Sequence, residues 1–379
     1  MACAVLVLYL GSTPSEDVYW SDFSTEAWPA FERLLAGDLS GFLTASPVAY
    51  GGSMVVRAPF GALAGALGFE SAPAVFRITA IPCVLALAAL AVVLAERVRG
   101  RSWLLVLGLG AAGPLAWQAV WFGHPEELLA IALAVGAVLA ALGDRALLAG
   151  ALLGLAVASK QWAVLAVLPT LLAASGHHIR LLAAAAAAGG AALAPIVLAD
   201  LGHFAAAQES LGSSAQWFRP RQLWWPLGAE PPAGLDHPLG AAVTPAWLAP
   251  YPKPLIVALS VPLAALWLRR RGPREDALLL LALLLLVRCL LDPWNVIYYH
   301  LPLVVALLAW EVVARRRLPV VTLLTTGAVW LSFETYDVAY GYGPWLVYLA
   351  WTLPLAAYMA RELYRLGPVE LRRPAPATA

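Results

Sequence analysis

The stretch RALLAGALLGLAVASKQWAVLAVLPTLLAASGHHIR, residues 145–180, decides the fold. It is apolar over nearly all of its length and has one polar break, at Lys160-Gln161. Because arginine-rich breaks remain on the cytoplasmic side of a membrane, Arg145 and Arg180 belong on the same side. The residues between them therefore cannot cross once. We predict two short helices that cross out and back, turning at Lys160-Gln161.

The composition extends this pattern to the whole chain. Of 379 residues, 61% are hydrophobic and 12% are charged, whereas a soluble domain has about 25% charged residues. Apolar runs of about 15 to 20 residues recur from end to end. We predict an all-α polytopic bundle, a single integral membrane domain over residues 1–379. The predicted spans, about twelve, lie near 1–11, 74–95, 102–121, 127–143, 146–159, 162–175, 179–199, 254–268, 277–291, 296–313, 318–333 and 345–361.

The charged residues fall into two populations that predict the orientation. Arginine-rich breaks hold most of the Lys and Arg, which assigns these breaks and both termini to the cytoplasm. The acidic breaks are then extracytoplasmic and include two long outer loops, 12–73 and 200–253. The run 1–11 covers only about half a bilayer. It lacks the features of a signal peptide, so we expect a first span shortened by a late start codon.

The first outer loop combines carboxylates with aromatic rings. Its candidate residues are Glu16, Asp17, Tyr19, Trp20 and Asp22. Carboxylates accept hydrogen bonds from sugar hydroxyls, and aromatic faces cover the apolar face of a pyranose. An amphipathic stretch at 29–39 is predicted to lie along the membrane surface. The alternative is a solvated loop with an interfacial aromatic belt.

Polar residues also gather at the other outer breaks. His124 and Glu127 follow one span, and Lys160 marks the tip of the hairpin. Arg288 and His300 lie at membrane depth, where ionisable side chains are costly and usually functional. For Arg288 the alternative is a buried pair with an acid one turn away, Asp292. The remaining candidates, from the second outer loop and a late outer turn, are Arg219, Arg221, Asp292 and Trp294.

The sequence contains no recognisable metal or nucleotide motif. HExxH, CxxC and GxxxxGK[ST] are absent, and the cytoplasmic breaks are too short for a nucleotide domain. Cys3, Cys83 and Cys289 lie in apolar segments and are expected to be small core residues. We expect no cofactor, no metal and no nucleic-acid partner. Substrates would arrive from the membrane lipid and from outside the cell.

Three segments together point to a known family. They are the acidic EDVYWSDF at 16–23, the block from Gly123 to Ala174 that begins GHPEELLA, and DPWNVIYYHLPLVVALLAWE at 292–311. The block is similar to the GHxE…R…AG…GLA…K…P pattern of bacterial polyprenyl-phosphomannose-dependent α-mannosyltransferases. The chain thus resembles C-type glycosyltransferases of family 87. The last segment resembles a late outer turn in actinobacterial members, and the Ala-, Leu- and Arg-rich composition fits such a source.

The resemblance implies a multi-pass plasma-membrane hexosyltransferase with an extracytoplasmic, metal-independent and inverting active site. It would move mannose from a polyprenyl-phosphate donor to a glycolipid or glycan acceptor. Arabinose is an alternative sugar, and the acceptor is open between a phosphatidylinositol glycolipid, a wall polysaccharide and a protein. Asp22 is the expected base, with Asp17 as its neighbour or substitute.

The remaining candidates are assigned to substrate binding. The cations would hold the lipid phosphate: Lys160, Arg219, Arg221 and Arg288. Polar side chains would line the sugar pocket: His124, Glu127 and His300. Aromatic rings would stack on the sugar: Trp20, Trp217 and Trp294.

Other functions compete with glycosyl transfer. A secondary transporter or flippase would also have many spans, but the two halves of the chain show no similarity and the charges collect at one face. A polymer ligase or lipid-linked oligosaccharide polymerase would concentrate function in a large late outer loop. A non-catalytic assembly partner is the last alternative.

Overall fold

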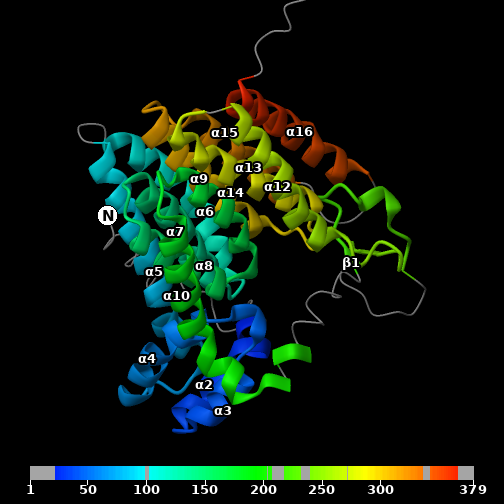
Figure 1. Cartoon of the computed structure of the whole chain (residues 1–379). Helices are drawn as coiled ribbons and strands as arrows, with labels where there is room; N and C mark the ends of the chain where they lie inside the picture. Colours follow the sequence, from blue (N-terminus) through cyan, green and yellow to red (C-terminus); the bar gives the residue numbers. More distant parts are fainter. Residues whose placement is uncertain are drawn as a thin grey trace, which may run out of the picture.

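The computed structural model describes residues 22–98, 102–202, 204–206, 217–231, 240–270, 272–335 and 342–365. This part of the chain forms a helical bundle, which confirms the all-α prediction, with one small β-hairpin beside it (Figure 1). The α-helices are α2 (Trp28–Leu35), α3 (Leu39–Ala45), α4 (Ser53–Ala66), α5 (Ala72–Arg97), α6 (Ser102–Trp121), α7 (Glu126–Leu142), α8 (Ala146–Ser159), α9 (Val167–Ala173), α10 (His178–Ala199), α12 (Pro252–Arg270), α13 (Ala277–Leu291), α14 (Leu301–Ala309), α15 (Val320–Trp330) and α16 (Gly343–Tyr364).

Shorter elements connect these helices. The 3-10 and π-helical turns are η1 (Phe23–Ala27), η2 (Val48–Tyr50), η3 (Gln161–Ala166), η4 (Trp225–Leu227), η5 (Arg274–Asp276), η6 (Ile297–His300), η7 (Trp310–Ala314) and η8 (Leu331–Thr335). Strand β1 (Trp217–Phe218) pairs antiparallel with β2 (Ala242–Val243).

The centre of the bundle consists of α7, α13 and α14. Helix α13 has the sequence ALLLLALLLLVRCLL and is buried on all sides, as expected for a helix that is apolar around its whole circumference. Helix α7 packs against α5, α8 and α14, while α13 packs against α12, α14 and α16. Their side chains belong to one continuous hydrophobic core. Surrounding helices therefore shield the three central helices from lipid.

The predicted out-and-back hairpin is confirmed. Helix α8 ends at Ser159, Lys160 has extended backbone, and the chain returns through η3 and α9. The Arg274 guanidinium spans the two ends of the hairpin, because Nε donates to the Ala173 carbonyl at 2.8 Å and Nη2 to Asp144 at 2.8 Å. Lys160 thus lies at the opposite end of the bundle from Asp144.

The arginine-rich breaks meet at one end of the bundle. Arg97 Nη2 donates to the Leu139 carbonyl at 2.9 Å, and Arg97, Arg145 and Arg316 line a common hollow. In the described ranges four helical segments are long and apolar enough to cross a membrane: Ala72–Arg97, His178–Ala199, Pro252–Arg270 and Ile297–Ala314. The count of twelve spans and the cytoplasmic position of the arginines stay predictions.

The other end of the bundle carries the short helices that precede α5. Helices α2, α3 and α4 lie together there, at the bottom of Figure 1. Helix α2 is amphipathic as predicted, since Phe31 is buried while Glu32 and Arg33 are exposed. It packs against α4 and so closes this end over η1.

Helices α8 and α10 approach each other through small residues. A Cβ at Gly154 would lie 2.1 Å from the Ala185 carbonyl oxygen, and one at Gly150 would lie 2.1 Å from that of Leu181. Small residues at a four-residue spacing are the usual means of close backbone packing between membrane helices. This contact holds α10 against the hairpin that carries Lys160.

We predict that Gly154→Ala destabilises the protein by about 1–3 kcal/mol, because the added methyl overpacks against a backbone carbonyl. The matched control is Gly190→Ala in α10, where an added Cβ meets nothing within 4 Å. Melting temperatures in detergent should fall for Gly154→Ala only. Equal melting temperatures for both variants would contradict the α8–α10 contact.

Candidate active site

A glycine turn brings together two residues that are far apart in sequence. Gly123, between α6 and α7, has a φ of +86°, and a Cβ there would lie 2.8 Å from the backbone nitrogen of Phe23. Only glycine combines this backbone conformation with such a close approach. The turn therefore packs directly on the start of η1, and its next residue, His124, faces Asp22.

His124 joins two carboxylates. Its Nε2 lies 2.9 Å from Asp22 Oδ2, and its Nδ1 lies 2.9 Å from Glu126 Oε1. Burial by itself lowers the His124 pKa, but the hydrogen bonds to Asp22 and Glu126 outweigh it and raise the pKa from 6.5 to about 9. The ring is therefore an imidazolium at neutral pH, and each ring nitrogen donates to one carboxylate.

Cations balance the two glutamates behind this histidine. Lys160 Nζ lies 3.0 Å from Glu126 Oε1 and 3.6 Å from Glu127 Oε1. Arg57 Nη1 lies 3.8 Å from Glu126 Oε2, and both side chains are fully buried. Three carboxylates and three cations, Asp22, Glu126, Glu127, Arg57, His124 and Lys160, thus form one network, which we call the charge cluster.

The three carboxylates of the charge cluster differ in exposure. The Asp22 side chain is 38% exposed, whereas those of Glu126 and Glu127 are 0% and 1% exposed. Glu127 also accepts a hydrogen bond of 2.8 Å from Trp162 Nε1. Asp22 is therefore the accessible carboxylate of the charge cluster, while the two glutamates contact its cations and the histidine.

Aromatic rings surround the charge cluster. Tyr50 stacks on His124 with 5.6 Å between ring centroids, and Tyr298 lies at 5.0 Å from the same ring. The Arg288 guanidinium lies 4.2 Å from the ring centroid of Tyr299 and 5.4 Å from that of Trp162. Through Trp162 and Glu127, Arg288 is thus connected to the charge cluster instead of forming only a local pair with its helix neighbour Asp292.

A second group of predicted residues lies at the end of α13. The Arg219 guanidinium lies 4.3 Å from the Trp294 ring centroid, and its backbone nitrogen donates to the Pro293 carbonyl at 2.9 Å. Asp292 Oδ1 accepts from the Trp294 backbone nitrogen at 3.0 Å. Arg221 is buried, and its Nε donates to the Ser332 carbonyl at 2.6 Å. Arg221 thereby links this group to η8.

His300 lies in a separate buried network. Its Nδ1 faces the Ile297 carbonyl at 3.1 Å, and its Nε2 lies 2.9 Å from the Tyr348 hydroxyl. Because a carbonyl only accepts, Nδ1 carries the proton. Asn295 Nδ2 also donates to Tyr348 at 3.0 Å. These contacts fix α16 against η6.

The predicted residues thus divide into four sets, one of which is His300 in its own buried network. The structure brings Asp22, His124, Glu127, Lys160 and Arg288 into one connected arrangement, and it gathers Arg219, Asp292 and Trp294 at the end of α13. Glu16, Asp17, Tyr19 and Trp20 lie outside the described residues.

Sequence reasoning missed two members of the charge cluster. Glu126 was passed over for its neighbour Glu127, and Arg57 was not recognised. A signal for Arg57 existed, because it is the only ionisable residue in the apolar run Ser53–Ala66, and a charge buried in such a run requires a partner. In the described ranges no group of three or more His, Cys, Asp or Glu has the arrangement of a metal site.

Comparison with known proteins identifies the family. A model of glycosyltransferase family 87 matches residues 51–293, more than half of the chain. The chain belongs to glycosyltransferase family 87. Family 87 membership makes it a membrane glycosyltransferase with a sugar donor and an acceptor, and selects that activity over a transporter. No curated protein and no solved structure matches the chain significantly.

The family 87 match covers most of the charge cluster. Arg57, His124 and Lys160 lie inside the matched residues together with both glutamates, whereas Asp22 precedes them. Asp22 therefore contacts the matched residues through His124.

We predict a pH-dependent contribution of His124 to stability. Because its folded pKa of about 9 exceeds the ordinary 6.5, the stabilisation is complete below pH 6.5 and is lost as the pH rises through about 9. Its size is on the order of 3 kcal/mol. The melting-temperature difference between wild type and His124→Gln should shrink between about pH 6 and about pH 10. A difference that does not change with pH would refute the imidazolium assignment.

Proposed function

We propose that this family 87 protein transfers a hexose, mannose in the first instance, from a polyprenyl-phosphate carrier to a hydroxyl group of a glycolipid or glycan. The reaction would take place at the extracytoplasmic membrane face, with inversion at the sugar carbon. The observation that carries the proposal is the 2.9 Å contact between a partly exposed carboxylate, Asp22, and the buried His124.

Asp22 is the proposed general base. A base must be ionised, oriented and within reach of the acceptor hydroxyl. The contact with His124 fixes the direction of one carboxylate oxygen of Asp22. Glu126 in turn orients the imidazolium, and Arg57 and Lys160 hold Glu126. We assign His124 and Glu126 as positioning residues for the base.

Arg288 and Arg219 are the proposed ligands of the donor phosphate. Lys160 is engaged by two glutamates, so its charge is already compensated within the charge cluster. Arg288 lies beyond the charge cluster on the far side of Trp162, and Arg219 lies over Trp294 near the same helix end. A guanidinium binds two phosphate oxygens at once, which suits a phosphate that gains charge as the sugar departs.

The proposed reaction is a single displacement. The acceptor oxygen forms a bond to the anomeric carbon while the bond from that carbon to the phosphate oxygen breaks. The hydroxyl proton passes to Asp22, and the electron pair of the broken bond leaves with the polyprenyl phosphate. The base and the phosphate ligands must then lie on opposite sides of the sugar. Tyr298, between His124 and Tyr299, is buried and packs against the His124 ring.

We predict that Asp22→Asn abolishes transfer of radiolabelled mannose from polyprenyl-phosphomannose to a membrane lipid extract, a loss of at least about 100-fold. Binding of polyprenyl phosphate should be nearly unchanged. The control is Glu32→Gln, which removes an exposed carboxylate from α2 at the same end. Full activity of Asp22→Asn would sink the base assignment. Inactivity of the wild type with both mannose and arabinose donors would contradict the proposal that the donor is a polyprenyl-phosphate sugar.

We predict that Arg288→Gln weakens binding of polyprenyl phosphate about 10- to 100-fold, the loss of a hydrogen bond to a charged group. The control is Arg33→Gln, which removes an arginine paired only at the surface with Asp38. Binding is measured by titration of the purified proteins in detergent. Equal affinities of wild type and Arg288→Gln would remove Arg288 from the phosphate site.

A further inference from the structure

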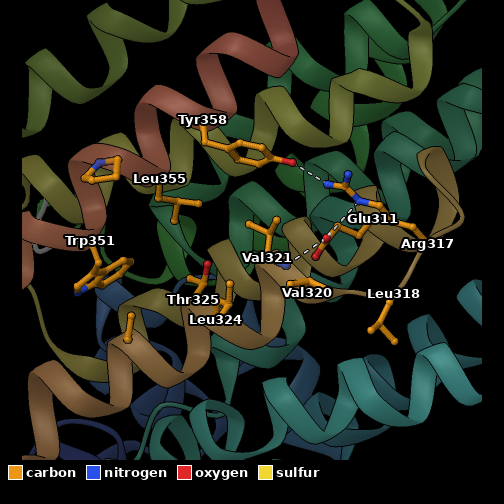
Figure 2. A pocket seen from close by; sticks show the side chains of 12 residues that line it. Glu311, Arg317, Leu318, Val320, Val321, Leu324, Thr325, Trp351, Leu355 and Tyr358 are labelled. Atoms are coloured by element: carbon orange, nitrogen blue, oxygen red, sulfur yellow. Dashed lines mark hydrogen bonds and ion pairs between the residues drawn. The ribbon is translucent and has the colours of Figure 1, made fainter.

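A groove lies between α15 and α16, away from the charge cluster. Its volume is about 660 Å³, within the roughly 300–1,000 Å³ of typical ligand sites. Figure 2 shows apolar side chains of both helices along its walls, among them Leu324, Leu355 and Trp351. Leu324 is 69% exposed, so the groove opens to the outside of the bundle.

All charged groups of the groove lie at one end. Arg317 and Glu311 precede α15, and Tyr358 belongs to the last turns of α16, so the three meet where α15 begins (Figure 2). From there the walls run along α15 to Ala328, about 12 Å at the helical rise. One leaflet of a bilayer's hydrocarbon core is roughly 15 Å thick. The groove is therefore about as long as one leaflet is thick. Its charged end would lie at the level of the lipid headgroups.

Two contacts fix the Arg317 side chain but leave part of its guanidinium accessible. Its Nη2 donates to the Tyr358 hydroxyl at 2.7 Å, and its Nε lies 3.5 Å from Glu311 Oε1. The Glu311 carboxylate also accepts from the backbone nitrogens of Val321 and Thr322 at 3.2 and 2.8 Å. The Thr322 hydroxyl donates to it at 2.9 Å. Because the start of α15 already satisfies Glu311, the guanidinium, whose side chain is 42% exposed, can bind a further anion.

The surrounding charge favours an anionic occupant. Arg317 follows two further exposed arginines, Arg315 and Arg316. Arg315 is paired with Glu362 at 3.0 Å and lies 4.0 Å from Asp276, while Arg316 lines the hollow that also contains Arg97, Arg145 and Glu96. Basic pockets between membrane helices on the cytoplasmic side bind anionic headgroups, and each nearby cation contributes about 1 kcal/mol.

We propose that this groove binds one anionic phospholipid, with its phosphate on Arg317 and an acyl chain along Leu324, Leu355 and Trp351. A zwitterionic lipid also carries a phosphate, but its ammonium group would lie among Arg315, Arg316 and Arg317, so a lipid with net negative charge is favoured. The proposed donor of glycosyl transfer binds at the opposite end of the bundle, so the two lipid sites are separate. The bound lipid would pack between α15 and α16 and contact both helices.

The test is lipid retention by the full-length protein, measured by native mass spectrometry after mixing with phosphatidylglycerol or phosphatidylcholine of the same acyl chains. We expect one tightly retained phosphatidylglycerol and at least tenfold less retained phosphatidylcholine. Arg317→Gln should reduce the retained phosphatidylglycerol to the phosphatidylcholine level. Leu324→Trp, which fills the exposed groove, should reduce retention of both lipids.

Two control variants keep the result interpretable. Arg361→Gln removes an exposed arginine of α16, and Leu346→Trp enlarges an exposed leucine of α16; neither residue lines the groove. Both controls should retain phosphatidylglycerol as the wild type does. Equal retention of the two lipids by the wild type, or unchanged retention by Arg317→Gln and Leu324→Trp, would overturn the proposal. So would a dimer that Leu324→Trp dissociates, because a second copy would then occupy the groove. None of these results depends on transferase activity.

Discussion

A charged group buried in an apolar bundle is stable only when it is paired with an opposite charge. This constraint determines the arrangement of the charge cluster. Arg57 and Glu126 are fully buried and would each cost several kcal/mol if left alone. Together with His124 and Lys160 they form a network that binds α4, α7 and the α8 hairpin to one another. Asp22 is the one carboxylate of this network with substantial exposure. The pairing that stabilises this end therefore also holds its accessible carboxylate in a fixed orientation.

The fold supplies the close approaches on which this arrangement depends. The turn at Gly123 lets His124 contact Asp22. Lys160, at the tip of the α8 hairpin, has extended backbone, which directs its side chain toward the glutamates. The central helices α7 and α13 are shielded by their neighbours, and α7 begins at the charge cluster. The arginine-rich breaks collect at the other end, where the α15–α16 groove begins. In the proposed mechanism, the transfer chemistry and the structural lipid therefore lie at opposite ends of the bundle.

Much of this organisation could be predicted from the sequence, because apolar run length and arginine position constrain every helix of a membrane bundle. The α8 hairpin and the grouping of His124, Glu127 and Lys160 followed from these rules. The contact between Asp22 and His124 could not be predicted, since it joins residues 102 positions apart through a turn whose packing depends on Gly123. Glu126 and Glu127 are adjacent, and only the orientation of α7 decides which of them faces the histidine. Arg57 was detectable in principle, because it is the one charge in the apolar run Ser53–Ala66.

The central claim is that Asp22, held by His124, accepts the proton of the acceptor hydroxyl. The most direct measurement is a cryo-electron microscopy structure with an unreactive polyprenyl-phosphate-sugar analogue and an acceptor glycolipid bound. We expect the acceptor hydroxyl within hydrogen-bond distance of Asp22, on the side of the sugar opposite the phosphate, with the Asp22–His124 contact intact. An acceptor hydroxyl that contacts a different carboxylate, with Asp22 turned away from the substrate, would contradict it.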